Sequence, residues 1–286
     1  MYIAVNGVTL FFDVEGASLV PDGSTMREKP TLLLLHGGPG VDHTIYKPAF
    51  SAFTDIAQIV YLDHRGNGRS DPSSSEFWNL AQWADDVYAF CEALGIKKPI
   101  VYGASFGGTV AQAYATKYPD HPSKLILVSA EGAGGGYLKE RVAHFRRLGG
   151  PEMGELAQRR LIDKQTDQAT LDDWIRLAFP LYSRTPRDPV VMQRMIRRPE
   201  ITDWFTRADG EGNRFNLLPE LSRIQCPTLV MGGEDDPMTP IECQVDIAAA
   251  IPAHLVQFER FSNCGHGVIL DAGEPAIKII RDFINS

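Results

Sequence analysis

Cysteine is scarce in this 286-residue sequence, and its four cysteines form no pairing or metal-binding pattern. No Cys-x-x-Cys pair and no spacing typical of a metal site occurs. We therefore expect reduced thiols and neither a metal nor another cofactor. A nucleophilic Cys264 is the less favoured alternative, because it lacks the strand-turn-helix context of an exposed nucleophile. The four residues are Cys91, Cys226, Cys243 and Cys264.

Long hydrophobic runs and an excess of positive charge are also missing. No apolar stretch approaches the roughly 18 residues of a membrane span. Residues 1–7 show neither the basic region nor the apolar core of a signal peptide. The net charge is −8 and the pI is near 5.4, which argues against nucleic acid as the main partner. These absences predict a cytoplasmic protein with no membrane or nucleic-acid partner.

Apolar runs of strand length alternate with helical patterns over most of the chain. Residues 2–14 alternate as a hairpin about Asn6-Gly7, and residues 16–30 are expected to form a loop. The pattern predicts an α/β fold, with a mostly parallel sheet and helices on both faces. Further strands are expected at 31–35, 56–62, 100–102, 124–129, 227–231 and 255–258, and helices at 77–94, 107–118, 240–250 and 273–284.

One block interrupts the alternation. Residues 137–220 are helical in pattern, contain six prolines, and carry 15 Lys/Arg against 13 Asp/Glu. We expect a helical lid, residues 133–220, over the carboxyl ends of the strands, where open α/β sheets bind ligands. The core would then comprise residues 1–132 and 221–286. Aromatic residues of such a lid more often form its own core, and the candidates for substrate contact are Trp174, Trp204 and Phe205.

The strand that begins at Ile100 runs directly into Gly103-Ala104-Ser105-Phe106-Gly107, followed by a helix rich in small residues. This is the sequence context of a nucleophile elbow, in which a serine stands on a tight strand-to-helix turn. A glycine-rich turn with a solvent-facing serine is the simpler alternative. A serine nucleophile also needs a base, an acid and oxyanion donors, and their presence in the sequence would favour the elbow over the simple turn.

An acid and then a histidine base should follow the serine along the chain. Of the seven histidines, His266 stands in a loop of small residues after the last strand and fits that order. Three carboxylates, Glu234, Asp235 and Asp236, follow the strand at 227–231. They could orient His266, or they could merely line a turn or cap the next helix.

An oxyanion needs fixed hydrogen-bond donors. The backbone N–H of Phe106, the residue after the serine, is one candidate. The second should come from the loop after Leu35, where Gly38 lets the backbone approach a substrate closely.

Several motifs together resemble the α/β-hydrolase fold, and the first of them resembles the proline iminopeptidase branch. The resemblance implies an α/β-hydrolase fold and a Ser105-Asp236-His266 triad. It selects Asp236 because the acid of that family stands four residues before a proline, here Pro240. The motifs are His36-Gly37-Gly38-Pro39-Gly40, Asp63-His64-Arg65-Gly66-Asn67-Gly68-Arg69-Ser70, Gly103-Ala104-Ser105-Phe106-Gly107-Gly108, Gly233-Glu234-Asp235-Asp236 and Gly265-His266.

We therefore expect a serine hydrolase that cleaves a small ester or amide through an acyl-enzyme, acting on a small molecule or short peptide. The alternatives are a proline iminopeptidase and a non-catalytic ligand-binding member of the fold. Iminopeptidases pair the substrate's amino group with carboxylates from the lid or beside the acid. Here the residue after Asp236 is Pro237, which has no carboxylate to offer. The candidates for pairing with a substrate amine are therefore the lid residues Asp203, Asp209 and Glu211.

Overall fold

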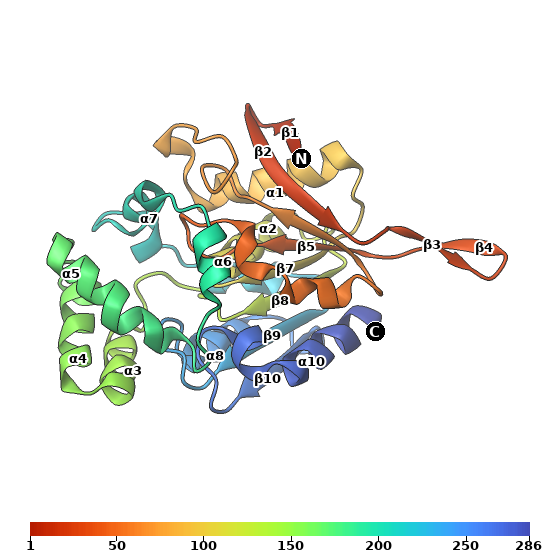
Figure 1. The fold of residues 1–286 in the computed structure, drawn as a ribbon. Helices are drawn as coiled ribbons and strands as arrows, with labels where there is room; N and C mark the ends of the chain where they lie inside the picture. The colour runs from red at the N-terminus through yellow and green to blue at the C-terminus, as the bar shows by residue number, and fades with distance from the viewer.

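An eight-stranded sheet runs through the centre of the structure, a computed structural model that describes residues 1–286 (Figure 1). The strand order is β1-β2-β6-β5-β7-β8-β9-β10. β2 is antiparallel to both of its neighbours, and all other pairs are parallel. The expected mostly parallel sheet is confirmed. Its strands are β1 (Tyr2–Val5), β2 (Val8–Glu15), β5 (Thr31–Leu35), β6 (Gln58–Leu62), β7 (Ile100–Ala104), β8 (Lys124–Val128), β9 (Thr228–Gly233) and β10 (Val256–Phe261).

The central strands bury both faces, which explains their continuous apolar sequences. Leu32 to Leu35 of β5 are completely buried. Alternate residues enter different cores: Leu33 and Leu35 join one hydrophobic cluster, and Leu32 and Leu34 join the other. Helices on each face complete these two cores. They are α1 (Leu80–Leu94), α2 (Phe106–Lys117), α8 (Ile241–Ala250), α9 (Val268–Ala272) and α10 (Glu274–Asn285).

Strand register brings the sequence motifs to one edge of the sheet. Leu35 pairs with both Leu62 and Gly103, so that the segments after β5, β6 and β7 begin side by side. Val128 of β8 pairs with Met231 of β9, which places the ends of these strands beside the same edge.

Local capping corrects one predicted helix boundary. The helix expected from residue 77 begins at Leu80, because the Asn79 side chain accepts a hydrogen bond from the Gln82 N–H at 2.9 Å and starts the helix there. Gly95, at φ 67°, ends it as expected.

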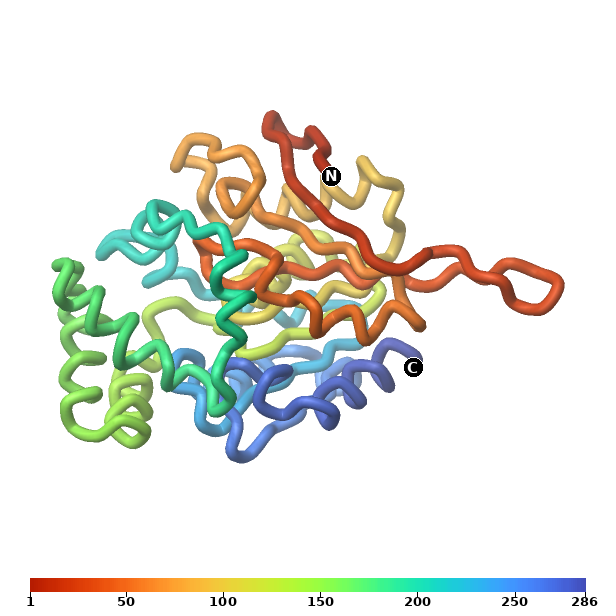
Figure 2. Tube along the Cα trace, viewed as in Figure 1, coloured from red at the N-terminus to blue at the C-terminus, as the bar shows by residue number.

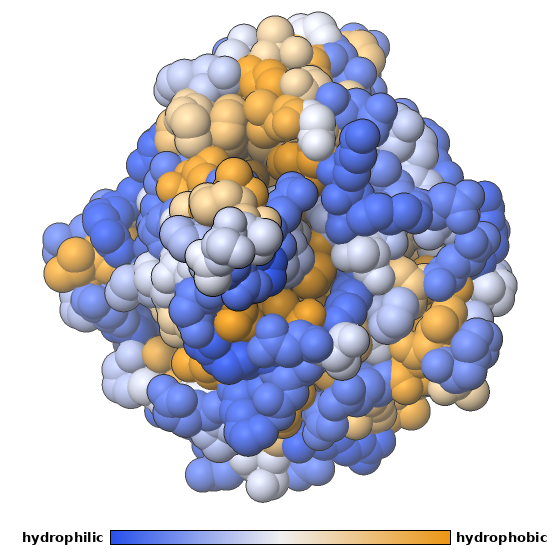
Figure 3. Space-filling model, turned by 90° about the vertical axis from the view of Figure 1, so that its right-hand side faces the viewer, coloured by the Kyte–Doolittle hydropathy of each residue, from blue (hydrophilic) through white to orange (hydrophobic).

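Two elements differ from the sequence expectation. Residues 16–30 form a small antiparallel hairpin, β3 (Leu19–Asp22) and β4 (Thr25–Glu28), instead of a loop. It projects beyond the sheet at the right of Figures 1 and 2. Its side chains are mostly exposed, so no hydrophobic alternation marked it. Figure 3 faces this end of the molecule, where hydrophobic side chains lie among hydrophilic ones. The short helix α9 also carried no sequence signal.

The inserted segment, residues 133–220, lies at the opposite end of the sheet from this hairpin (Figures 1 and 2). Its ends run side by side, since Gly134 N–H donates to Phe215 O at 2.8 Å and Leu217 N–H donates to Gly132 O at 2.8 Å. Phe145 is at the centre of a small core of its own. Its helices are α3 (Leu138–Gly149), α4 (Pro151–Ala157), α5 (Gln168–Asp173), α6 (Pro189–Arg194) and α7 (Pro199–Thr206).

Short helical turns complete the chain. None of the helices combines the length and the hydrophobicity needed to cross a bilayer. The 3₁₀ turns are His43–Tyr46, Ala49–Phe53, Ser75–Phe77, Phe179–Tyr182, Glu211–Asn213 and Leu218–Arg223, and the π turns are Gln158–Ile162 and Trp174–Ala178.

Candidate active site

Ser105 stands on the turn between β7 and α2, with backbone angles of φ 54° and ψ −125°. A positive φ is strained for a residue with a side chain, and such strain persists only where the surroundings enforce it. Here the Ser105 N–H donates to Val128 O at 2.9 Å, and the Ser105 carbonyl accepts from Gly108 N–H at 2.9 Å. The turn has the backbone strain expected of a nucleophile elbow, and Ser105 is partly exposed.

The loop after β5, residues 36–42, passes directly beside this turn, and we call it the oxyanion loop. A Cβ at Gly107 would overlap the carbonyl oxygens of Leu35 and His36, so only glycine permits this approach. A Cβ at Gly37 would meet the Ser105 Cβ at 3.4 Å. The structure therefore brings the predicted oxyanion loop into contact with the predicted nucleophile.

The predicted donors belong to these two segments. Phe106 is the first residue of α2, and a first-turn N–H has no partner within its helix. Gly38 is exposed at the surface of the loop. Both N–H groups are thus on segments that adjoin Ser105.

Asp236 and His266 are paired, although 30 residues separate them in the chain. His266 Nδ1 lies 2.8 Å from Asp236 Oδ2. The same oxygen accepts the Thr239 hydroxyl at 2.6 Å, and Oδ1 accepts the N–H groups of Met238 and Thr239 at 2.8 and 2.9 Å. The aspartate fixes the orientation of the imidazole ring, and the Nδ1–H tautomer leaves Nε2 free.

The environment of Asp236 favours its charged form. The side chain is completely buried, and burial alone would raise its pKa. The charge of His266 and hydrogen bonds from His266 and Thr239 outweigh burial and lower the pKa below its usual value. Asp236 is therefore a carboxylate at neutral pH. It does not cap α8, whose N-cap residue is Pro240.

Asp235, the neighbouring carboxylate, has different partners. It pairs with two arginines of the inserted segment, Arg147 at 2.7 Å and Arg184. It therefore ties that segment to the loop after β9, and it does not contact His266 through any hydrogen bond.

The inserted segment also contacts the histidine loop. The His266 N–H donates to Tyr182 O at 2.6 Å, and the Tyr182 ring lies edge-on to the imidazole with centroids 5.9 Å apart. Asp271 of α9 accepts from Gly265 N–H at 2.8 Å and from Arg184 N–H at 3.0 Å. These contacts hold the histidine loop and the inserted segment together.

The three predicted substrate-contact aromatics occupy separate places. Phe205 is buried in the larger core, 5.4 Å from the Phe106 ring between centroids. Trp174 packs against Phe145 within the inserted segment and donates to Tyr182 Oη at 3.1 Å. Trp204 lies under the guanidinium of Arg207, 3.6 Å from the ring centroid. The structure does not bring the three rings together, and substrate contact stays a prediction for each.

Sequence reasoning missed a buried arginine near Asp236 and further cations near that arginine. Arg141 of α3 is buried and forms an ion pair with Glu131, which follows β8. Burial lowers the pKa of Arg141, and Asp236 and Tyr182 are among the groups that act against this shift. Burial also lowers the pKa of Lys164, and the nearby cations Arg141 and Arg160 add to the effect. The slight excess of Lys and Arg in residues 137–220 was the only sequence signal.

Cys264 is buried and has no properties of a nucleophile. Burial raises the pKa of its thiol to about 12, so the sulfur is protonated at neutral pH. The structure gives no support to the alternative of a cysteine enzyme.

Two buried histidines, His36 at the start of the oxyanion loop and His64 after β6, should make stability depend on pH. His36 Nε2 accepts the His64 N–H at 3.1 Å, and the two rings are 4.5 Å apart between centroids. Burial lowers the pKa of His36 and, more strongly, of His64. The unfolded chain therefore binds protons at a higher pH than the folded chain does. Stability from these residues is fully present above about pH 6.5 and is lost as the pH falls toward their folded pKa values.

We expect thermal unfolding temperatures to fall between pH 7 and pH 5, and to fall less in His64→Gln. Protonating His64 would bury an unpartnered charge, since its Nε2 has no hydrogen-bond partner. The cost is at most about 1.4 kcal/mol per pH unit for each group. Thermal melts at pH 7, 6 and 5 measure this, with the exposed His254→Gln as control. An identical decline in both variants would contradict the assignment.

Comparisons with known proteins agree with this geometry. Residues 30–273 match the family described as alpha/beta hydrolase fold. The chain is 28% identical over 283 residues to Proline iminopeptidase PfmaB of Pestalotiopsis fici, covering 96% of this chain and 98% of that protein. It is 23% identical over 274 residues to Monoacylglycerol lipase abhd6-B of Xenopus laevis, covering 90% and 76%. The solved structure of Proline iminopeptidase from Mycobacterium smegmatis aligns with a TM-score of 0.81 at 19% identity, covering 100% and 97%, and shares the fold.

Proposed function

This chain belongs to the α/β-hydrolase fold family, and from that premise we propose that it is a serine hydrolase cleaving a small ester or amide through an acyl-enzyme. The observation that carries the proposal is the 2.8 Å contact between Asp236 and His266 in a chain whose Ser105 has the strained backbone of an elbow. A nucleophile, a base and an orienting acid are the groups that acyl transfer requires.

In the first step, Ser105 Oγ attacks the carbonyl carbon of the substrate. The hydroxyl proton passes to His266 Nε2, while Nδ1–H keeps its hydrogen bond to Asp236 Oδ2. A new C–O bond forms as the carbonyl π electrons move onto its oxygen. The N–H groups of Phe106 and Gly38 are the proposed donors to that oxyanion. Losing one such donor typically costs about 3 kcal/mol of transition-state stabilisation.

The tetrahedral intermediate then collapses and expels the alcohol or amine, which takes the proton from His266. Water attacks the acyl-enzyme in the second half of the cycle, and His266 accepts the water's proton. Collapse of the second intermediate breaks the bond to Ser105 Oγ, which regains a proton from His266. The buried, charged Asp236 stabilises the imidazolium in both halves.

The exposure and existing partners of the lid carboxylates favour a substrate, an ester or amide, that lacks a free amine. Asp209 is exposed and paired with Arg207 at 2.9 Å, and Asp203 is also exposed. Glu211 accepts the Leu80 N–H at the start of α1 at 2.9 Å. A buried substrate ammonium would need an unengaged carboxylate, because an unpaired buried charge is costly.

The charges near His266 point the same way. Arg141 and Arg160 both act on the pKa of Tyr182, whose ring packs against His266. Burial is the main cause that raises that pKa, to about 12. The one carboxylate that pairs with Arg141 is Glu131. The positive charges of Arg141 and Arg160 would repel a substrate ammonium, and the nearby carboxylate of Asp236 is already engaged by His266 and Thr239.

A proline iminopeptidase is the second candidate, favoured by the similarity to PfmaB. The non-catalytic alternative is less favoured, because binding alone requires neither a strained serine nor an oriented imidazole. A fluorophosphonate probe distinguishes an enzyme from a non-catalytic protein, since only an activated Ser105 is labelled. Boiling the protein first should prevent labelling.

The deciding assay compares kcat/KM for p-nitrophenyl esters of graded chain length with kcat/KM for prolyl- and alanyl-p-nitroanilide. The proposal expects the esters to be cleaved faster. Faster release of N-terminal proline, dependent on its free amine, would replace it with the iminopeptidase function.

Neutralising the lid carboxylates should have weak and equal effects on both substrate types. We expect Asp203→Asn, Asp209→Asn and Glu211→Gln each to change KM by less than about threefold, because their charges are solvated or engaged elsewhere. KM is measured for a short p-nitrophenyl ester and for prolyl-p-nitroanilide, with the exposed Glu220→Gln as control. A large rise in KM for the anilide alone, in any one variant, would identify the ammonium partner of an iminopeptidase.

A further inference from the structure

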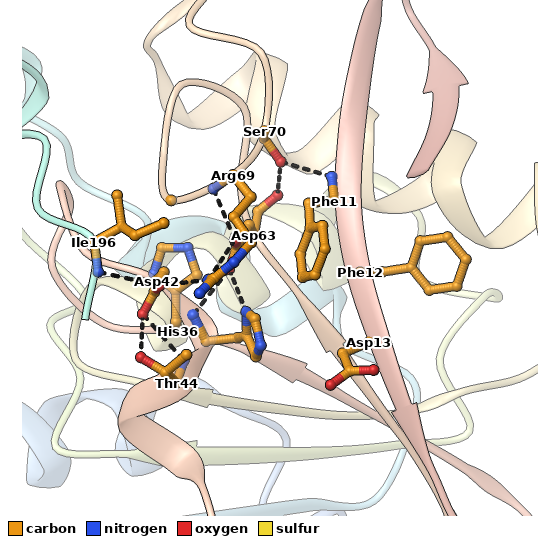
Figure 4. Close-up of polar contacts among 12 residues, drawn as sticks. Phe11, Phe12, Asp13, His36, Asp42, Thr44, Asp63, Arg69, Ser70 and Ile196 are labelled. Carbon is orange, nitrogen blue, oxygen red and sulfur yellow. Dashed lines mark hydrogen bonds and ion pairs between the residues drawn. The ribbon is translucent and has the colours of Figure 1, made fainter. Parts of the chain in front are cut away.

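A buried polar network connects the end of the oxyanion loop to the segment after β6 (Figure 4). It shares no residue with the Asp236-His266 pair. It contains two completely buried carboxylates, Asp42 and Asp63, with His43 and Arg69. Buried carboxylates are costly unless several donors satisfy them. The partners of each carboxylate therefore show what the network holds in place.

Asp63, just after β6, organises the base of the network. Its Oδ1 lies 2.7 Å from His43 Nδ1 and accepts the His43 N–H at 2.9 Å. Its Oδ2 accepts the Arg69 N–H at 2.9 Å. All these side-chain partners lie outside the inserted segment, so the Asp63 carboxylate connects the segments after β5 and β6.

Asp42 has a wider reach, because its four donors come from three segments. The Thr44 N–H and hydroxyl donate at 3.1 and 2.5 Å, both from the turn that follows the oxyanion loop. Arg69 Nη1 donates at 2.6 Å. The fourth donor is the N–H of Ile196 in the inserted segment, at 3.2 Å and 154 residues away in the chain. Figure 4 shows the Ile196 nitrogen turned toward Asp42.

The same stretch of the inserted segment contacts the oxyanion loop twice more. The Gly40 carbonyl accepts the Arg198 N–H at 2.8 Å, and the Pro39 carbonyl accepts the Thr202 hydroxyl at 2.6 Å. A Cβ at Gly40 would overlap Arg198 and Thr202, so the two chains touch. Residues 196–202 are thus attached to the oxyanion loop immediately after Gly38.

We propose that Asp42 is a positioning residue, which locks the oxyanion loop to residues 196–202 of the inserted segment and thereby sets the Gly38 N–H for catalysis. The inference rests on the proposed function. Gly38 has no side chain and is exposed, so its neighbours must fix its direction. Asp42 is the buried charge on which the loop, Arg69 and the inserted segment converge.

Asp42→Asn tests this role with almost no change in shape. All four partners donate, and an amide NH₂ group cannot accept, so at least one donor would face another donor. We expect kcat for a p-nitrophenyl ester to fall about 10- to 100-fold with KM changed less than threefold, since small misplacements of this kind act on the transition state.

A merely structural role would lower stability without this kinetic pattern. Affinity for a boronic acid that mimics the tetrahedral intermediate should therefore fall in proportion to kcat/KM. Asp86→Asn is the matched control, because Asp86 is also buried and paired with an arginine, Arg65 at 2.7 Å. The hydrogen-bond donors to the Asp86 carboxylate all lie outside the inserted segment. It should lower the unfolding temperature and leave kcat and inhibitor affinity within about threefold of wild type.

The link to the inserted segment has its own test, which does not depend on the folding of Asp42→Asn. Ile196→Pro removes the N–H that donates to Asp42, and Met195 has the extended ψ of 124° that a residue before proline needs. Ile196→Val keeps the N–H. We expect kcat and boronic-acid affinity to fall about 3- to 10-fold in Ile196→Pro and less than twofold in Ile196→Val.

Two results would overturn the proposal: unchanged kcat and inhibitor affinity in Asp42→Asn, or equal values in Ile196→Pro and Ile196→Val. A failure of the proposed function looks different, because the wild-type protein itself would then neither hydrolyse esters nor take up a fluorophosphonate at Ser105.

Discussion

Ser105→Ala should lower kcat for ester hydrolysis about a millionfold, to the residual level that binding and oxyanion donors supply. The serine oxygen forms the covalent bond in the proposed mechanism, and His266 cannot act on a methyl group. Hydrolysis of a p-nitrophenyl ester measures the loss. Ser129→Ala is a matched control, because Ser129 is a buried serine at the end of β8 whose Oγ has no hydrogen-bond partner.

Labelling gives an independent readout of the same substitution. A fluorophosphonate should add its mass to wild-type protein and to Ser129→Ala, and not to Ser105→Ala. Near-wild-type turnover or undiminished labelling in Ser105→Ala would show that another residue is the nucleophile.

Asp236→Asn should lower kcat about 10⁴-fold. Its amide would donate to His266 Nδ1 and so favour the tautomer with its proton on Nε2, which cannot accept the Ser105 proton. The fold should tolerate the change less well than a surface substitution, because Asp236 is buried and accepts three hydrogen bonds from Met238 and Thr239. Single-turnover kinetics with the same ester, checked by circular dichroism, separate the two effects.

Asp235→Asn is the matched comparison, one residue away. It weakens the ion pairs with Arg147 and Arg184, and side chains of those arginines are about half exposed, 50% and 42%. Such pairs contribute roughly 0–1 kcal/mol. We expect kcat to change less than tenfold. If Asp235→Asn proved the more damaging of the two, the acid would have to be reassigned to Asp235.

Short-range patterns in the sequence were sufficient for the sheet and for the family. The strands β5, β7, β8 and β9 are buried on both faces, so their apolar runs reported both their position and their environment. The elbow could be located because strained backbone and close approach permit only a few residue types, such as Gly107 beside Leu35. Asp236 was selected by family resemblance rather than by pattern, since Glu234 and Asp235 fit the pattern equally well.

Other features could not be predicted from the sequence, because they depend on long-range contacts or leave no pattern in it. The β3–β4 hairpin is exposed, so no burial periodicity marks it. Arg141 becomes buried only because the inserted segment folds back onto Glu131. The contact of Asp42 with Ile196 joins residues that no local motif connects. Thr239 could have been noticed, since a carboxylate followed three residues later by threonine is a common turn pattern.

The attachments of the inserted segment restrict how the protein could be redesigned or could diverge. That segment meets the oxyanion loop at Asp42 and Gly40, the loop after β9 at Asp235, and the histidine loop through Tyr182. A chimaera carrying a relative's segment would have to reproduce all three docking points to keep its turnover. Substitutions in residues 196–202 that are selected for a new substrate would also move the oxyanion loop that these residues contact. Under the proposal, substrate range and catalytic rate would therefore change together during evolution.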